Sequence, residues 1–284
     1  MSELTNVSVI GAGTMGLGIA HVFALGGYDV NLVDSSKDSL EKALISIENN
    51  LGKQVKKESI TAEEADISFD RISGESNIDS AINSQLVIEA AYEKKEVKET
   101  ILKELDSLCP SETVLATNTS SISISELASV TSRGDKVIGM HFFNPVPIMK
   151  LVEIIKGRST SVETFLFIKS VIEHLGKIPV EVNDSPGFIS NRVLMPMINE
   201  AVFVLMENVS SAEDIDQVMK LGMNHPMGPL ALADFIGLDV CLNIMEVLQE
   251  GFNNDKYRPC PLLQKKVAAG ELGRKTGIGF YNYS

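Results

Sequence analysis

The chain has 284 residues, 44% of them hydrophobic and 22% charged, a composition that excludes intrinsically disordered and fibrous proteins. Its 25 basic and 38 acidic side chains give a formal net charge of −13, so we expect no binding to nucleic acid or to an anionic membrane surface. No apolar run approaches the roughly 20 residues of a membrane span, and the first residues lack the pattern of a signal peptide.

The three cysteines, Cys109, Cys241 and Cys260, are odd in number and lack zinc-ligand spacing. They predict free thiols in a reducing compartment, and therefore a cytoplasmic protein without a disulfide framework or a metal site. Free cysteines of this kind are usually buried or half-buried.

The first part of the chain alternates short apolar runs with helical patterns. The apolar runs predict strands at 7–10, 30–33, 86–90, 114–117, 137–141 and 151–155. The helical patterns predict a helix up to residue 25 and others at 40–57, 94–108 and 164–175. This alternation is typical of a parallel sheet wrapped by helices, so we expect an α/β fold with a Rossmann-type domain over residues 1–184.

The character of the chain changes after a turn at 184–187. Helix-forming residues then dominate and predict helices at 188–206, 212–221 and 235–249, which indicates an all-helical C-terminal domain over residues 185–284. Seven of the 11 methionines lie in this part. Methionines suit an adaptable subunit interface, but an ordinary methionine-rich core explains them equally well.

The sharpest motif, GAGTMG at 11–16, directly follows the first apolar run and opens a helix. Gly11 permits a tight turn, Gly13 lets a pyrophosphate approach the backbone, and Gly16 lets the helix pack close to the strand. The N–H groups and partial positive charge at the start of the helix favour a diphosphate. An acidic protein needs a local site of this kind to hold a phosphorylated ligand.

Asp34 ends the second predicted strand, 18 residues after Gly16. A carboxylate at this place can accept hydrogen bonds from the adenosine ribose and would repel a 2′-phosphate. Ser35 and Ser36, which follow it, supply no arginine for such a phosphate. The motif therefore predicts NAD rather than NADP. The alternative is a structural glycine turn with an aspartate near a helix start.

Removal of a hydride from an alcohol needs a base for the hydroxyl proton, and histidine is the commonest one. His21 lies inside the first predicted helix, His174 on a predicted surface helix and His225 in a loop. His141 ends the run at 137–141, and open α/β sheets bind ligands at the carboxyl ends of their strands. His141 is therefore the candidate base, with a core or surface histidine as the alternative.

Glu153 lies in the middle of the apolar run LVEII at 151–155. An apolar strand tolerates a glutamate only if it is paired or faces a polar site. The proline-rich bend before this run can fold Glu153 back onto His141, where its carboxylate would fix the imidazole tautomer and stabilise the imidazolium. A place on the solvent face of an edge strand is the alternative.

Two further polar segments lie where a ligand is expected. Residues 118–121 (NTSS) follow the strand predicted at 114–117, and their side chains suit a carbonyl or a nicotinamide ribose. The stretch from Ser121 onward is equally typical of a helix N-cap. The segment GFISNR at 187–192, which contains Asn191, opens the first long helix at the domain junction, and junctions are common ligand sites.

Together these residues resemble the L-3-hydroxyacyl-CoA dehydrogenase family along essentially the whole chain. The resemblance rests on GAGTMGLGIA (11–20), LVIEAAYE (86–93), TNTSS (117–121), GMHFFNPVPIMKLVEII (139–155), DSPGFISNR (184–192), MGPL (227–230) and GRKTGIGFYNY (273–283). The segment from histidine to glutamate and DSPGFISNR are together highly specific. In length the chain is most similar to the stand-alone bacterial members that act on 3-hydroxybutyryl-CoA.

The resemblance implies a role for each matching residue. His141 is implied as the general base and Glu153 as its partner, with Ser120 and Asn191 bound to the reacting oxygen or the acyl carbonyl. NAD contacts are implied for Gly11, Ala12, Gly13, Thr14, Met15, Gly16, Asp34, Ala90, Glu93, Lys98, Ser120, Asn144 and Lys275. Substrate contacts are implied for Ser120, Asn144, Asn191, Lys53 and Lys57. Without the resemblance, the cluster formed by Lys53, Lys56 and Lys57 is typical of a solvated helix face.

The resemblance further implies reversible hydride transfer between NAD and C3 of a short-chain 3-hydroxyacyl-CoA, which interconverts (S)-3-hydroxybutyryl-CoA and acetoacetyl-CoA. It implies a homo-oligomer, a dimer or a dimer of dimers, formed through the helical domain. Two rivals stay open. A dehydrogenase of free hydroxy acids has no use for a basic cluster that meets distal phosphates, and a catalytically idle relative would lack His141 or Glu153.

Overall fold

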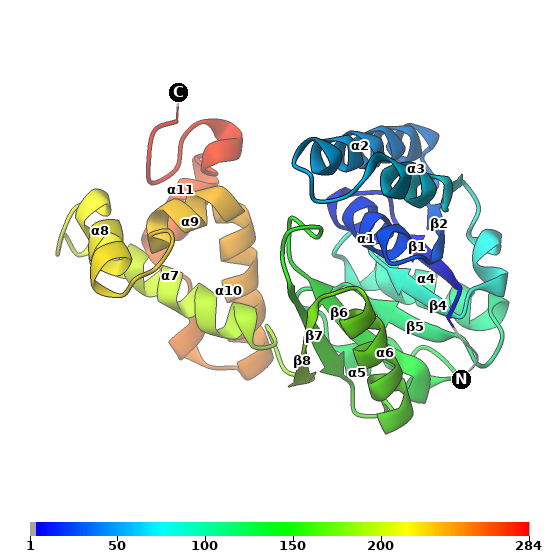
Figure 1. Ribbon diagram of the computed structural model, residues 1–284. Helices are drawn as coiled ribbons and strands as arrows, with labels where there is room; N and C mark the ends of the chain where they lie inside the picture. Colours follow the sequence, from blue (N-terminus) through cyan, green and yellow to red (C-terminus); the bar gives the residue numbers. More distant parts are fainter. Residues whose placement is uncertain (1–3, 284) are drawn as a thin grey trace. The chain divides into compact units, whose positions relative to one another are not determined.

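The computed structural model describes residues 4–283. The chain divides into two compact units, residues 1–184 and 185–284 (Figure 1). The first unit is built on a sheet and the second on helices, which confirms the predicted fold class. Within the described residues, no helix combines the length and the apolar character needed to span a bilayer.

An eight-stranded sheet forms the centre of the first unit, in the order β3-β2-β1-β4-β5-β6-β7-β8. The strands are β1 (Asn6–Ile10), β2 (Asp29–Val33), β3 (Ile72–Glu75), β4 (Leu86–Glu89), β5 (Val114–Thr117), β6 (Val137–Phe142), β7 (Leu151–Lys156) and β8 (Ile178–Asn183). Neighbouring strands run parallel except for β6 and β7, which pair antiparallel. The strand order reverses between β1 and β4, the kind of place where doubly wound sheets bind dinucleotides.

Helices cover this sheet and bury its apolar side chains. They are α1 (Thr14–Leu25), α2 (Lys37–Lys56), α3 (Ala62–Asp70), α4 (Lys95–Leu108), α5 (Ile124–Ala128) and α6 (Val162–His174). Helices α2 and α3 pack on α1, which lies between them and the sheet (Figure 1). The largest core joins side chains of the strands with those of α1, α2 and α6, so the positions of these elements are fixed by a common apolar interior.

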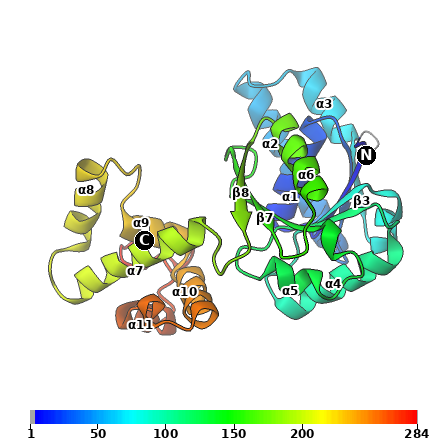
Figure 2. The ribbon, with the colours of Figure 1, turned by 90° about the horizontal axis from the view of Figure 1, so that it is seen from below.

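The second unit consists of α7 (Ser190–Met206), α8 (Ala212–Gly222), α9 (Pro229–Ile236), α10 (Leu238–Phe252) and α11 (Pro261–Ala268), around an apolar core of its own (Figure 2). The single helix predicted at 235–249 is wrong at its start. Gly237 adopts a φ of +105°, which ends α9 and lets the chain begin α10 in a new direction.

Two buried carboxylates hold the second unit together. Asp216 accepts hydrogen bonds from the backbone of Leu230 and Ala231 at the start of α9. Asp234 accepts hydrogen bonds from the backbone of Phe280 and Tyr281. The Tyr281 hydroxyl donates to Asp216 as well, at 2.8 Å, so the C-terminal segment is tied to both α8 and α9.

His21 of α1 is buried between helices. Its Nε2 lies 3.3 Å from the side-chain oxygen of Gln54 on α2, and its Nδ1 has no hydrogen-bond partner among residues 4–283. Burial lowers the pKa of His21 below its ordinary value, and the nearby charge of Lys177 lowers this pKa further. The native protein therefore holds His21 in its neutral form.

This neutral histidine predicts a loss of stability in mild acid. The unfolded chain binds the proton at a higher pH than the native protein does. The free energy of unfolding should therefore fall as the pH is lowered from about 7 to about 5. Urea unfolding across this range should show a smaller fall for His21→Gln than for the wild type. The exposed His174→Gln is the control, and an unchanged slope in His21→Gln would contradict the prediction.

Candidate active site

The glycine loop between β1 and α1 has the shape that a diphosphate needs. A β-carbon on Gly11, whose φ is +108°, would lie 2.7 Å from the Ala90 carbonyl oxygen, and one on Gly16 would lie 1.7 Å from that of Gly11. At Gly13, apart from the residue itself and its two chain neighbours, no described atom lies within 4 Å of the position of a β-carbon. Helix α1 has no side-chain N-cap, so its first N–H groups are left to a ligand, and the loop fits NAD.

Asp34, at the end of β2, lies beside this loop. Its Oδ2 accepts a hydrogen bond of 2.8 Å from the backbone of Ala12, and its Oδ1 accepts one of 2.9 Å from that of Ser36. These bonds hold the carboxylate next to the glycine loop. No ion pair of Asp34 occurs within the described chain, so its acceptor capacity suits ribose hydroxyls.

His141 and Glu153 form a buried pair across β6 and β7. The antiparallel register places the two residues opposite each other, and His141 Nδ1 lies 2.8 Å from Glu153 Oε2. The residues are only 6% and 2% exposed. Because a carboxylate accepts but cannot donate, Nδ1 carries the proton of this bond, and the neutral imidazole has its lone pair on Nε2. The pair has the arrangement of a general base with an orienting carboxylate.

The loop after β5 is held against the end of β6. The side-chain oxygen of Asn118 accepts a hydrogen bond of 2.9 Å from the backbone of Phe142, the residue after His141. The nearby helix α5 has Ser123 as its N-cap rather than Ser121, and the Asp184 carboxylate accepts hydrogen bonds from its first turn. The loop that carries Ser120 is therefore fixed at both ends.

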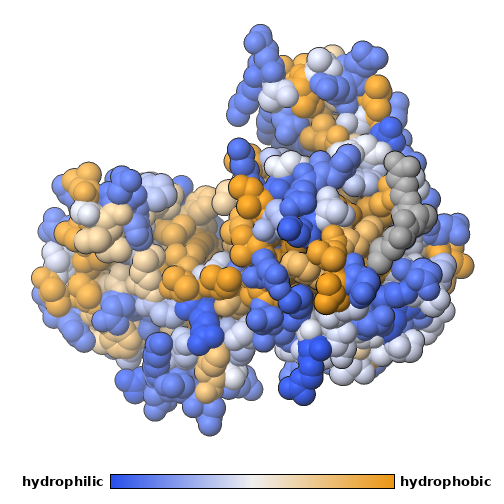
Figure 3. All heavy atoms as spheres, turned by 60° about the horizontal axis from the view of Figure 1, so that its bottom comes forward, coloured by the Kyte–Doolittle hydropathy of each residue, from blue (hydrophilic) through white to orange (hydrophobic). Residues whose placement is uncertain are grey.

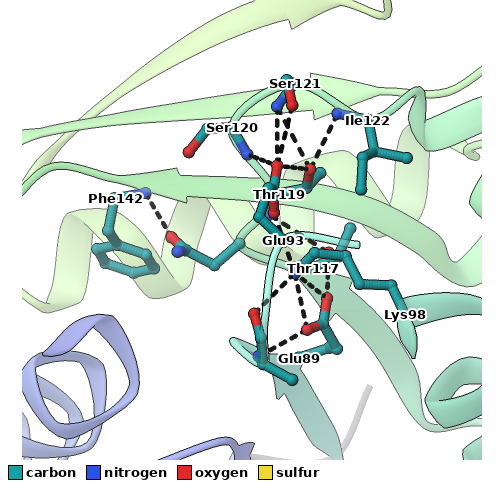
Figure 4. A network of polar contacts seen from close by, with 11 residues as sticks. Glu89, Glu93, Lys98, Thr117, Thr119, Ser120, Ser121, Ile122 and Phe142 are labelled. Atoms are coloured by element: carbon teal, nitrogen blue, oxygen red, sulfur yellow. Dashed lines mark hydrogen bonds and ion pairs between the residues drawn. The ribbon is translucent and has the colours of Figure 1, made fainter. Parts of the chain in front are cut away.

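Glu93 holds the middle of the same loop. Its Oε1 accepts hydrogen bonds from the Thr119 hydroxyl at 2.6 Å and from the backbone of Ser120 and Ser121 at 2.8 and 3.1 Å (Figure 4). Its Oε2 lies 3.3 Å from the Lys98 ammonium. The structure thus brings together three of the predicted residues, Ser120, Glu93 and Lys98, through contacts within the protein.

Glu89, at the end of β4, belongs to this network although the sequence analysis does not single it out. It is completely buried, and its carboxylate contacts the Lys98 ammonium at 2.8 and 2.9 Å. Like Glu153, Glu89 is a glutamate in an apolar strand, LVIE, which tolerates it only if it is paired or faces a polar site. That signal was available in the sequence.

The remaining predicted residues of the first unit lie on its surface or beside the glycine loop. Ala90 follows β4 and donates its backbone N–H to Ile10. Asn144 is exposed in the bend between β6 and β7. Lys53 and Lys57 are exposed at the C-terminal end of α2. Thr14 and Met15 form the start of α1.

Two predicted residues belong to the second unit. Asn191 is the second residue of α7 and is buried, with 9% of its surface exposed. Lys275 is half exposed, and its ammonium lies 2.6 Å from Asp239 Oδ2. In the described part of the chain, no group of three or more histidine, cysteine or carboxylate side chains is placed to hold a metal ion.

Family models match both units. The NAD-binding domain of 3-hydroxyacyl-CoA dehydrogenase matches residues 6–185, and the C-terminal domain of the same enzyme matches residues 187–283. The chain belongs to the 3-hydroxyacyl-CoA dehydrogenase family. This confirms the resemblance found in the sequence, the assignment as an oxidoreductase and NAD as the cofactor.

Individual relatives agree over nearly the full length. A probable 3-hydroxybutyryl-CoA dehydrogenase of Bacillus subtilis is 52% identical over 281 residues, which cover 99% of this chain and 98% of the relative. The human mitochondrial hydroxyacyl-coenzyme A dehydrogenase is 43% identical, and the match covers 98% of this chain and 91% of the relative. The crystal structure of an (S)-3-hydroxybutyryl-CoA dehydrogenase from Ralstonia eutropha is similar to this chain with a TM-score of 0.97 and 49% identity. The match covers 99% of this chain and 100% of the other.

The three glycines should separate folding from cofactor binding. Gly16→Ala places a methyl group against a carbonyl oxygen and should cost about 3 kcal/mol or prevent folding. Gly13→Ala meets no protein atom, so its melting temperature should stay near that of the wild type, while its Kd for NADH should rise about tenfold or more because the diphosphate no longer approaches the backbone. Thermal unfolding and NADH fluorescence titration measure the two effects. Unchanged NADH affinity in Gly13→Ala would refute this account of the loop.

Proposed function

We propose that this protein interconverts (S)-3-hydroxybutyryl-CoA and acetoacetyl-CoA, with NAD as the hydride acceptor or donor. The observation that carries the proposal is the buried His141–Glu153 pair on β6 and β7. His141 lies near the carboxyl end of β6, at the same edge of the sheet as the loops that follow β1, β4 and β5. The names of the Bacillus and Ralstonia relatives support a short acyl chain.

The proposed mechanism uses Nε2 of His141 as the base. Bound NAD supplies the hydride chemistry, and the protein supplies the proton transfer and the orientation of the substrate. His141 takes the hydroxyl proton while the hydride leaves C3, and in the reverse direction it protonates the oxygen at C3. Glu153 stabilises the imidazolium that forms. Because both side chains are buried, the ion pair is little screened by water.

Three further residues are proposed to hold the substrate. Ser120, on the loop fixed by Glu93, and Asn191, at the start of α7, would donate hydrogen bonds to the reacting oxygen or the acyl carbonyl. Asn144 would help to position substrate and cofactor. The cytoplasm is the proposed location, since Cys109, Cys241 and Cys260 are all free and buried.

An NADH-oxidation assay tests the proposed activity. Acetoacetyl-CoA should be reduced, and free acetoacetate should be a far poorer substrate because it lacks the nucleotide and pantetheine contacts. Chiral analysis of the product should give the (S) isomer. Equal rates with acetoacetate would favour the rival, a dehydrogenase of free hydroxy acids, and no NADH oxidation with either substrate would favour an idle relative.

The His141–Glu153 pair predicts a specific loss of turnover. His141→Gln should lower kcat by about 10²- to 10⁴-fold, the usual effect of removing a general base, and leave the Kd for NADH nearly unchanged. Glu153→Gln should lower kcat as well, since the imidazolium loses its charged partner. The measurement is steady-state kinetics with acetoacetyl-CoA across pH. A wild-type rate for Glu153→Gln at every pH would remove Glu153 from the mechanism.

Lys53 and Lys57 are proposed to meet the phosphates of coenzyme A. They lie one helical turn apart at the end of α2, where the backbone of Lys57 donates to the carbonyl of Lys53 at 3.2 Å. Both side chains are exposed, and within residues 4–283 neither forms an ion pair. A favourable interaction with the C-terminal end of the helix also explains lysines in this position, so the proposal needs a direct test.

The test compares two thioesters. Lys53→Ala/Lys57→Ala should raise the KM for acetoacetyl-CoA about three- to tenfold and leave kcat nearly unchanged, because contacts far from the reacting atoms bind ground state and transition state alike. The KM for acetoacetyl-pantetheine, which lacks the nucleotide, should not change. Lys42→Ala, an exposed lysine of the same helix, is the control. Equal increases for the two thioesters would contradict a phosphate contact.

The second unit is proposed to form the interface of a homo-oligomer, a dimer or a dimer of dimers. An apolar groove of about 500 Å³ lies along α7 and α8, lined by side chains that include Met197, Val204, Val218 and Met219. Leu221, also on α8, is 75% exposed. Figure 3 shows hydrophobic side chains gathered on the surface of this unit, on the left of the view. An exposed apolar groove of this kind suits a contact with a second copy of the chain.

Sedimentation velocity at micromolar concentration tests this interface. The wild type should sediment as a dimer or a larger even-numbered species. Val218→Glu/Leu221→Glu, which places two charges on α8, should shift the distribution to monomer. Val162→Glu, at a position that is 66% exposed on α6 of the first unit, should have no effect. A monomeric wild type would refute the proposed interface.

A further inference from the structure

Glu89 and Lys98 form an ion pair inside the first unit, at the carboxyl end of β4. Glu89 is completely buried and Lys98 of α4 is 1% exposed, and the ammonium lies within 2.9 Å of both carboxylate oxygens. Charges so fully removed from water are costly unless each finds a partner of opposite sign. A pair of this kind is therefore expected to have a role that an apolar pair could not fill.

The Glu89 carboxylate fixes the backbone that follows β4. One oxygen accepts a hydrogen bond of 2.7 Å from the Ala91 N–H, and the other accepts one of 2.6 Å from the Thr117 hydroxyl on β5. The Ala90–Ala91 peptide is also the surface against which Gly11 packs, because a β-carbon on Gly11 would lie within 2.9 Å of its atoms. Glu89 thus ties the loop after β4 to β5 beside the glycine loop.

Lys98 carries the connection onward. Its ammonium lies 3.2 Å from the Ala91 carbonyl oxygen and 3.3 Å from Glu93 Oε2. The other carboxylate oxygen of Glu93 accepts hydrogen bonds from the backbone N–H groups of Ser120 and Ser121 (Figure 4). A continuous set of contacts therefore runs from Glu89 through one ammonium and a second carboxylate to the loop that carries Ser120.

The strand order places this network under one half of the cofactor. Asp34 follows β2 and would hold the adenosine, and the glycine loop follows β1 and would hold the diphosphate. Beyond β1 the next strands in the sheet are β4 and β5, so the residues that follow them would hold the nicotinamide half. Those residues belong to the loops that Glu89, Lys98 and Glu93 hold.

We propose that Glu89 is a positioning residue for the nicotinamide half of the NAD site, which acts through Lys98 and Glu93 and does not touch the cofactor. The proposal rests on the proposed function in assigning Ser120 to the site. Without the Glu89 charge, the buried ammonium has Glu93 as its one carboxylate partner in the described network and draws it away from the Ser120 loop. The adenosine half, held by Asp34 and the glycine loop, keeps its geometry.

Binding of two ligands to Glu89→Gln tests the proposal without any turnover. Glutamine preserves size and can still accept the Ala91 N–H, so ADP-ribose, which lacks nicotinamide, should bind within about twofold of the wild type. The Kd for NADH should rise about 3- to 30-fold, the range seen for couplings that reach a ligand through intermediate residues. NADH fluorescence and calorimetry with ADP-ribose give the two constants. Glu96→Gln, at an exposed position of α4, is the matched control and should change neither.

Two results would overturn the proposal: an unchanged Kd for NADH, or equal losses for NADH and ADP-ribose, which would mean a purely structural role. Should Glu89→Gln not fold, Glu89→Asp is measured instead. Aspartate keeps the charge but moves it away from the Lys98 ammonium by one methylene, so a smaller rise in the Kd for NADH, with no change for ADP-ribose, is expected. If acetoacetyl-CoA is not reduced by the wild type, the proposed function fails, but the binding constants still decide the role of Glu89.

A second measurement tests the route through Lys98. If Glu89 acts through the ammonium, Glu89→Gln should change the Kd for NADH by less than about twofold in a Lys98→Met background, because the buried charge that needs Glu89 is gone. Additive effects of the two substitutions would show that Glu89 acts independently of Lys98 and would overturn that part of the proposal.

Discussion

The candidate site depends on the register of one antiparallel strand pair. Strand β7 runs against β6, so Glu153 lies directly opposite His141 and the two polar side chains satisfy each other inside the protein. A slip of one residue would turn Glu153 to the other face of the sheet and leave a buried carboxylate without its partner. The pairing that makes the sheet stable is thus the pairing that orients the proposed base.

The same principle governs the other carboxylates of this region. Asp34 is held by backbone N–H groups, Glu93 by the loop at 119–121, and Glu89 by Lys98 and Thr117. Each carboxylate joins segments that follow or end different strands: Asp34 joins the end of β2 to the glycine loop, Glu93 joins the loops after β4 and β5, and Glu89 joins the end of β4 to β5 and α4. A protein with a net charge of −13 can in this way concentrate acidic groups at one edge of the sheet and still bind NAD, because the start of α1, which has no side-chain N-cap, would offer its N–H groups to the two phosphates.

Much of this arrangement follows from local patterns in the sequence. The glycine loop and Asp34 are recognisable because their spacing reflects backbone geometry. Strands β1, β2, β4 and β5 are recognisable because strands inside a parallel sheet are mostly apolar. Strands β3 and β8 escape prediction since they lie at the two edges of the sheet, where exposed and half-buried positions interrupt the apolar pattern.

Contacts between distant segments are harder to predict. Ser123 rather than Ser121 caps α5, and the Asp184 carboxylate, about 60 residues away, accepts hydrogen bonds from the same turn. The division between α9 and α10 depends on the positive φ of Gly237, which a helical pattern does not reveal. Glu89 is partly predictable from the sequence. Its place in an apolar strand indicates that the carboxylate has a partner, but it does not identify Lys98 as that partner.

The tautomer of His141 is the most direct measure of whether the strand register orients the base. The chain has four histidines, so ¹⁵N NMR of the imidazole rings, with the spectrum of His141→Gln for assignment, can resolve this one. At neutral pH we expect a proton on Nδ1 and an unprotonated Nε2 in the wild type, and loss of this preference in Glu153→Gln. A protonated Nε2 in the wild type, or the same tautomer with and without Glu153, would contradict this expectation.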